Sequence, residues 1–234
     1  MENIFAQPGK PMPHGATIVN DGVNFSVFTR NGTSVILDIF QNPEDENPCF
    51  SYTFDPKINR TGDIWHVFLK GLKAGALYLY RVDGPFNPEK GHRFNKNTYL
   101  LDPYAKSFTD CSVFANLPPD YVTPVDKIDI LTGKPHSAKG FPKCVVIDDD
   151  EFDWQGDRPI NYPLRQSVLY ETHLKGFTAD PSSGVKNPGT YKGLIEKIPY
   201  LKELGVTSVE FLPIQEFDEY ENTNVNPKNG ERLK

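Results

Sequence analysis

The sequence contains no run of about 18 apolar residues, which is the length that a membrane-spanning helix requires. Its start, MENIFAQPGKPMPHG, has neither a basic region nor an apolar core, so it does not resemble a secretory signal. The sequons that begin at Asn31 and Asn59 therefore carry no weight as glycosylation sites. Lys and Arg form no cluster, and the net charge is −6 with a pI of about 5.4. These absences argue against a membrane or a nucleic acid as the main partner.

Cysteine is also scarce. Cys49, Cys111 and Cys144 are odd in number and far apart, so they fit neither a disulfide framework nor a metal site. We expect reduced thiols in a cytoplasmic protein. The composition is that of a soluble globular protein, with 38% hydrophobic and 24% charged residues and a mean hydropathy of −0.50. By contrast, 21 prolines and 12% aromatic residues indicate a loop-rich β region beside a helical one.

The first half of the chain carries strand patterns. Apolar and polar residues alternate from Val23 to Val27, which is the period of a half-buried strand. Asn31-Gly32 is a hairpin signal, and SVILDIF (34–40) is expected to return as the paired strand. Segments 63–69 and 76–82 form a second candidate pair, joined through Gly71 and Gly75. Short strands with regular turn signals predict a β-sandwich.

The pattern changes twice after the predicted sandwich. Residues from about Asp102 to Arg165 are rich in Pro, Gly and Asp and read as an irregular connection. From Ser167 the pattern is α/β: SVLYE and VTSVEFLP read as buried strands with helical segments between them. Leu194, Ile195 and Ile198 share a face of the first helical segment, Pro199 fits the first turn of the next one, and Gly205 ends it. This crossover predicts parallel strands.

Motifs that would identify a catalytic site are absent. The sequence has no G-x-S-x-G elbow, Walker loop, G-x-G-x-x-G fingerprint or H-E-x-x-H zinc motif. We therefore assign no catalytic, cofactor-binding or metal-ligating residue, and we expect no cofactor. The acidic run Asp148–Glu151 could hold a metal ion, but a solvated turn is the simpler explanation, because ligands must converge in space. His92, His136 and His173 lack metal-ligand spacing.

A few other side chains have two interpretations each. His173, at a strand end, either lines a pocket or is packed and hydrogen-bonded. Trp65 and Tyr80 either stack on sugar rings or pack in the core, and their strand patterns favour the core. Gln215-Glu216 follow a strand, where ligands bind in parallel α/β sheets, although Glu216 also suits a surface salt bridge.

Several segments form an ordered set along the chain. They are GHRFN (91–95), LLDPYAKS (100–107), W-x-x-D-R-P (154–159), Y-E-x-H-x-K-G-F-T (170–178), YLKELGVT (200–207) and V-E-F-L-P (209–213). Together they resemble the isoamylase-type glycogen debranching enzymes of glycoside hydrolase family 13, from about Gly15 to Phe217. At Gln215 the sequence departs from relatives, which often carry His there.

The resemblance implies a fold class and an activity. The fold is an immunoglobulin-like β-sandwich of the carbohydrate-binding module family 48 type over residues 1–110, an irregular connection over 111–165, and the first βαβ portion of an incomplete (β/α)₈ barrel over 166–234. The implied partner is an α-glucan, and the implied reaction is hydrolysis of α-1,6 branch linkages in glycogen or limit dextrins. In such retaining enzymes one carboxylate attacks the anomeric carbon and a second, protonated one donates to the leaving oxygen.

The length of the chain bears on this activity. The family's catalytic carboxylates lie at the ends of strands four, five and seven of a barrel that needs ~250 residues. We therefore expect a truncated N-terminal piece, inactive by itself, whose partner is the missing C-terminal barrel segment. Apolar strand residues at Val168, Leu169, Val209 and Phe211 should then be exposed. The alternative is a stand-alone glycan-binding or scaffolding module without catalysis.

Overall fold

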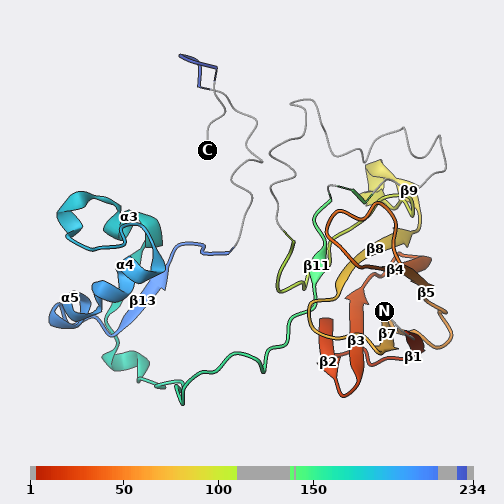
Figure 1. Cartoon of the computed structure of the whole chain (residues 1–234), viewed down its shortest axis with the longest axis horizontal. Coiled ribbons are helices and arrows are strands. Elements are labelled where there is room, and N and C mark those ends of the chain that lie inside the picture. The colour runs from red at the N-terminus through yellow and green to blue at the C-terminus, as the bar shows by residue number, and fades with distance from the viewer. Residues whose placement is uncertain (1–3, 110–137, 140, 216–225, 231–234) are drawn as a thin grey trace. The chain divides into compact units, whose positions relative to one another are not determined.

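The computed structural model describes residues 4–109, 138–139, 141–215 and 226–230 (Figure 1). It divides into two compact units. Unit 1 comprises Met1–Phe152 with Asp218–Lys234, and unit 2 comprises Asp153–Phe217. Strands dominate the described part of unit 1, whereas unit 2 combines short helices with one pair of strands. None of the helices in the described ranges is long and apolar enough to cross a bilayer.

Unit 1 contains two main sheets, and both are antiparallel. The first has the strand order β1-β7-β3-β2, with β6 beside β7, and the second has the order β11-β8-β4-β5. The first sheet is built from β1 (Phe5–Pro8), β2 (Gly15–Val19), β3 (Gly22–Phe28), β6 (Arg60–Thr61) and β7 (Ile64–Lys70). The second is built from β4 (Ser34–Phe40), β5 (Phe50–Thr53), β8 (Leu77–Asp83) and β11 (Cys144–Val145). A two-stranded hairpin follows, made of β9 (Phe86–Asn87) and β10 (His92–Arg93) around the 3-10 turn Pro88–Lys90.

The two sheets share one hydrophobic core, as the predicted β-sandwich requires. Val23 and Phe25 of β3 and Trp65 of β7 come from the first sheet, and Leu37 of β4 and Tyr78 of β8 come from the second. All five side chains are buried because alternate residues of each strand point to the same face. Burying each such side chain contributes roughly 1.5–3 kcal/mol.

The predicted hairpin at Asn31-Gly32 is wrong, although both of its strands are present. β3 pairs with β2 and β7, whereas β4 pairs with β5 and β8. The connection crosses between the sheets. The Thr29 N–H donates to the Asp63 carbonyl on the first sheet, and the Thr33 N–H donates to the Asp83 carbonyl on the second. A strand pattern identifies the buried face but not the neighbouring strand, which explains the error.

The second predicted pair fails for the same reason. β7 and β8 belong to different sheets, and the connection between them begins and ends with glycines at positive φ. The Gly71 N–H donates to the Asp21 carbonyl at 2.8 Å, beside the first sheet. The Gly75 N–H donates to the Val146 carbonyl at 2.8 Å, beside the second. The glycines therefore serve a crossover and not a hairpin.

Segments that flank residues 110–137 return to the second sheet. Leu100 forms an isolated bridge with Tyr80, and Phe108 forms one with Cys144 of β11. The Thr109 N–H donates to the Lys143 carbonyl at 2.8 Å, and the Lys143 N–H donates to the Thr109 hydroxyl at 2.9 Å. Part of the predicted connecting segment therefore adds a strand to the sandwich.

Unit 2 has the parallel strands expected from its pattern. β12 (Leu169–Thr172) pairs in parallel with β13 (Ser208–Phe211). Between them lie α3 (Leu174–Ala179), the 3-10 turn Pro181–Ser183, α4 (Tyr191–Glu196) and α5 (Ile198–Glu203), and the 3-10 turn Leu164–Gln166 precedes β12 (Figure 1).

Local sequence signals set the ends of these helices. The Thr190 side chain accepts the Gly193 N–H and caps α4, and Pro199 lies in the first turn of α5. Gly205 follows α5 with a φ of 81°, as predicted for a helix stop. Leu201 is buried, but Ile195 of the predicted apolar face is 61% exposed. The described part of unit 2 thus forms its helices without burying that whole face.

Candidate functional site

The carboxyl ends of the two parallel strands lie side by side in unit 2. β12 ends at Thr172 and β13 at Phe211, and these two residues are register partners. The Leu212 N–H donates to the Thr172 carbonyl at 3.0 Å, which extends the pairing past the strand. His173 follows β12 directly, and Gln215 follows β13 after a short stretch; both are exposed. In parallel α/β sheets this is the edge at which ligands bind.

His173 caps the helix that follows it. Its Nδ1 accepts the Gly176 N–H at 3.0 Å at the start of α3, and its carbonyl accepts the Phe177 N–H at 2.9 Å. Because Nδ1 is an acceptor, the neutral ring carries its proton on Nε2, which can donate outward. The structure shows the hydrogen bond of the second interpretation, but His173 is exposed and so its ring is not packed.

Side chains of α3 and α4 hold the loop between these two helices. The Thr178 hydroxyl accepts the Gly189 N–H at 2.9 Å. The Glu196 carboxylate accepts the Lys186 N–H at 2.9 Å and the Asn187 side-chain amide at 3.1 Å. The hydrogen bond from the Lys186 N–H lowers the pKa of Glu196 below its usual value. The loop between α3 and α4 is therefore held by side chains of both helices.

Trp65 and Tyr80 are core residues, as their strand patterns favoured. Their exposed fractions are 0% and 1%. The Arg60 guanidinium lies 5.0 Å from the centre of the Trp65 ring system, and the Trp65 Nε1–H donates to the Thr29 carbonyl at 3.3 Å. Neither aromatic side chain has a surface on which a sugar ring could stack.

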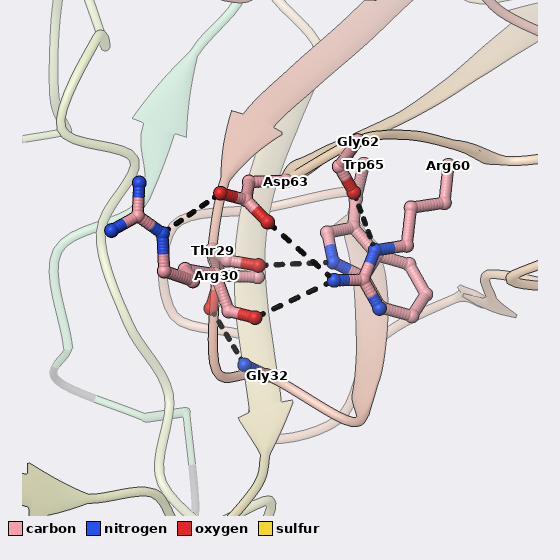
Figure 2. A network of polar contacts seen from close by, with 7 residues as sticks. All are labelled: Thr29, Arg30, Gly32, Arg60, Gly62, Asp63 and Trp65. Atoms are coloured by element: carbon pink, nitrogen blue, oxygen red, sulfur yellow. Dashed lines mark hydrogen bonds and ion pairs between the residues drawn. The ribbon is translucent and has the colours of Figure 1, made fainter.

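A charged network surrounds Trp65 at one end of the first sheet. Figure 2 shows Asp63 between two arginines. Its carboxylate accepts from the Arg30 Nε at 2.8 Å and lies 3.8 Å from the Arg60 Nη2. The Arg60 Nε also donates to the Gly62 carbonyl at 2.8 Å. The Arg30 side chain is 70% exposed, so this network is a solvated surface feature over a buried indole.

The acidic run behaves as a turn. The Asp150 N–H donates to the Asp148 carboxylate at 3.0 Å, and Asp149 pairs with Lys106. Across the described residues no group of His, Cys, Asp and Glu is arranged to hold a metal ion. His92 lies in β10 with its ring 6.2 Å from that of Phe94. The remaining predicted positions, Cys111, His136 and Glu216, lie outside the described residues.

Sequence reasoning missed a buried polar cluster around Asp102. The Asp102 carboxylate accepts hydrogen bonds from the Tyr78 hydroxyl at 2.9 Å and the Tyr104 N–H at 2.8 Å. The backbone N–H of Asp102 donates to the Cys144 sulfur at 3.2 Å. Burial raises the pKa of Asp102, and it raises the pKa of Cys144 to about 12. An Asp before Pro predicts a turn, and nothing in the pattern indicates that the carboxylate is buried. The cluster fastens the segment after β10 to the second sheet.

Comparisons with known proteins found relatives that match across both units. Residues 13–105 match the family model of carbohydrate-binding module 48, described as the isoamylase N-terminal domain. Isoamylase 1 of the Arabidopsis thaliana chloroplast is 40% identical over 227 residues, which cover 94% of this chain and 27% of that protein. The glycogen debranching enzyme of Yersinia enterocolitica is 40% identical over 210 residues, covering 88% of this chain and 30% of the enzyme. The chain therefore spans roughly a quarter to a third of the curated relatives it matches.

Solved structures share the fold. The pullulanase from Bacillus acidopullulyticus has a TM-score of 0.61 at 23% identity, covering 90% of this chain and 23% of that one. The product complex of the glycogen-degrading pneumococcal virulence factor SpuA has a TM-score of 0.61 at 20% identity, covering 93% and 21%. At these identities the similarity supports the fold alone. The resemblance inferred from the ordered motifs is confirmed by the sequence relatives.

Proposed function

We propose that this chain, which matches isoamylases and glycogen debranching enzymes over most of its length, is the N-terminal part of a glycosidase that hydrolyses α-1,6 branch linkages in an α-glucan. The observation that carries the proposal is the extent of the match. The family 48 model covers residues 13–105, but the 40% identity to isoamylase 1 extends over 94% of the chain and so includes unit 2. A module that only binds glycan would have no reason to retain the second part.

Unit 2 fits the beginning of a (β/α)₈ barrel. Its two strands are parallel and are joined through helices, which is the repeating unit of such a barrel. Val168, directly before β12, and Leu169, its first residue, are 50% and 56% exposed, while Val209 and Phe211 of β13 are half-buried. Strands inside a barrel read as continuous apolar runs because both faces are covered. Further strands would cover these side chains.

The chemistry in this proposal belongs to residues beyond the 234 of this chain. A retaining glycosidase needs a carboxylate nucleophile and a carboxylic acid about 5–5.5 Å apart. The edge formed by β12 and β13 would contribute substrate contacts instead. There the first turn of α3 orients His173, whose Nε2–H can donate to a sugar hydroxyl, and Gln215 offers both a donor and an acceptor.

Reading the coding sequence past codon 234 and expressing the longer product tests the proposal. That product should release linear maltooligosaccharides from a branched limit dextrin, while the 234-residue chain should release none. Reducing-end assays combined with chain-length profiling distinguish debranching from cleavage of α-1,4 linkages. A longer product that leaves α-1,6 branches intact would refute the proposed reaction.

The match to carbohydrate-binding module 48 favours a second candidate, a glycan-binding or scaffolding module without catalysis. This candidate predicts a natural product with a mass near 26.4 kDa that binds glycogen and cleaves nothing. The intact mass of the protein in its source cells separates the two candidates, because the debranching enzyme requires a much larger product.

A further inference from the structure

A pocket of about 620 Å³ opens at one end of the sandwich, where the β2–β3 turn meets the β7–β8 connection. We call it the turn pocket. Its lining includes Phe5, Ile18, Asn20, Asp21, Lys70 and Leu72. The volume lies within the range of about 300–1,000 Å³ that is usual for small-ligand sites. The pocket lies wholly within unit 1.

Apolar side chains line part of the turn pocket. Leu72 is 3% exposed and belongs to the shared core, and Ile18 is half-buried against that core. Phe5 of β1 is 57% exposed, so the face of its ring remains available. A pyranose ring presents a flat face of C–H groups as well as hydroxyls, so an exposed aromatic ring beside other apolar side chains suits it.

Charged side chains also line the turn pocket, and their charges balance. Lys70 and Lys73 contribute two positive charges, and Asp21 and Asp148 contribute two negative ones. Lys70 and Asp21 form an ion pair with 2.9 Å between Nζ and Oδ2. Ammonium groups donate hydrogen bonds and carboxylates accept them, which matches hydroxyls that do both. This balance of positive and negative charges favours a neutral polyhydroxy ligand over a phosphate or a metal cation.

The backbone around the pocket is tied together before any ligand arrives. The Gly71 N–H donates to the Asp21 carbonyl at 2.8 Å, which joins the two connections directly. The Gly75 N–H donates to the Val146 carbonyl at 2.8 Å and anchors the other end of the β7–β8 connection. A site that is already ordered loses little conformational entropy on binding.

From these features we infer that the turn pocket binds a short stretch of a neutral α-glucan chain, with Phe5 stacking on a sugar ring and the Asp21–Lys70 pair bonding its hydroxyls. The ligand class rests on the proposed function, whereas the location rests on the pocket itself.

Electrophoresis of the full 234-residue chain through native gels with and without glycogen tests this inference. Phe5→Ala and Lys70→Met remove the stacking ring and the charged donor. Phe28→Ala is the matched control, because Phe28 is also a half-exposed ring (50%) on the same sheet. It lies at the end of β3 away from the pocket, since the other end, Gly22, is the register partner of Lys70. We expect glycogen to retard the unaltered chain and Phe28→Ala, with binding roughly tenfold weaker in Phe5→Ala and Lys70→Met.

Two results would overturn the inference. Equal retardation of all variants would mean that glucan binds elsewhere, and unchanged mobility of the unaltered chain would mean that the chain does not bind glucan. Neither result bears on whether the longer product cleaves α-1,6 linkages. Hydrogen exchange of the unaltered chain with maltoheptaose guards against misfolded variants: the amides of residues 71–75 should gain protection, and the absence of protection there would also count against the pocket.

Discussion

Removing the charge of Arg81 should destabilise the sandwich far more than removing that of an exposed arginine. The Asp38 carboxylate is fully buried and accepts from the Arg81 Nε at 2.5 Å, the Arg81 Nη2 at 3.0 Å and the Ser51 hydroxyl at 2.5 Å. Arg81→Met keeps much of the apolar stem but leaves Asp38 with a single hydroxyl donor. Breaking a buried pair in this way costs about 3–5 kcal/mol. Loss of the contact with the Tyr99 ring, at 5.6 Å, adds to the cost.

Arg30→Met is the matched control, because the substitution is the same and the partner is again an aspartate. The side chains of Arg30 and Asp63 are 70% and 36% exposed, and such a pair contributes about 0–1 kcal/mol. Urea unfolding followed by Trp65 fluorescence, in a Trp154→Phe background, reports on the sandwich alone. Equal losses in the two variants would refute the argument that burial makes the Asp38 pair costly to break.

The remaining predictions concern a buried acid, two glycines and two thiols. Burial raises the folded-state pKa of Asp102 above 3.8. Its contribution to stability is therefore full below that pH and is lost as the pH rises through the folded-state pKa. The urea midpoint should fall with rising pH for this reason between about pH 3 and 7, and Asp102→Asn should remove that pH dependence. A Cβ on Gly193 would lie 2.2 Å from a backbone carbonyl oxygen, so Gly193→Ala should lower the free energy of unfolding by about 1–3 kcal/mol. A Cβ on Gly176 would have its nearest atom at 3.6 Å, so Gly176→Ala should leave that free energy unchanged or raise it by about 0.4–1 kcal/mol. Hydrogen exchange of unit 2 would measure both, and equal effects would contradict the steric argument. Cys144 is buried with a pKa of about 12, so it should resist iodoacetamide at neutral pH in the folded chain, whereas exposed Cys49 should be alkylated. Mass mapping of the labelled peptides measures this difference, and rapid labelling of Cys144 would show that the core opens.

The sequence predicted strands better than it predicted their neighbours. The four segments expected in the first half are all strands, because alternation reports which face is buried. Their pairing depends on contacts between distant residues, such as β1 with β7, and local turn signals do not encode those. Asn31-Gly32 permits a tight turn in a hairpin or in a crossover, so the dipeptide could not decide between them.

One candidate site could be predicted from local sequence, whereas the others depend on contacts between distant residues. The edge carrying His173 could be foreseen, because a strand followed by a polar loop places its end residues at the ligand side of a parallel sheet. The turn pocket could not, since Phe5 and Lys70 meet only after β1 pairs with β7. Asp102 was equally hidden, because its burial depends on Cys144, far along the chain.

The paired hydrogen bonds between Thr109 and Lys143 have a practical consequence for engineering. Thr109 and Lys143, which are 34 positions apart in the chain, therefore lie side by side at one edge of the second sheet. A fluorescent label at either position would report on the same edge of the sandwich.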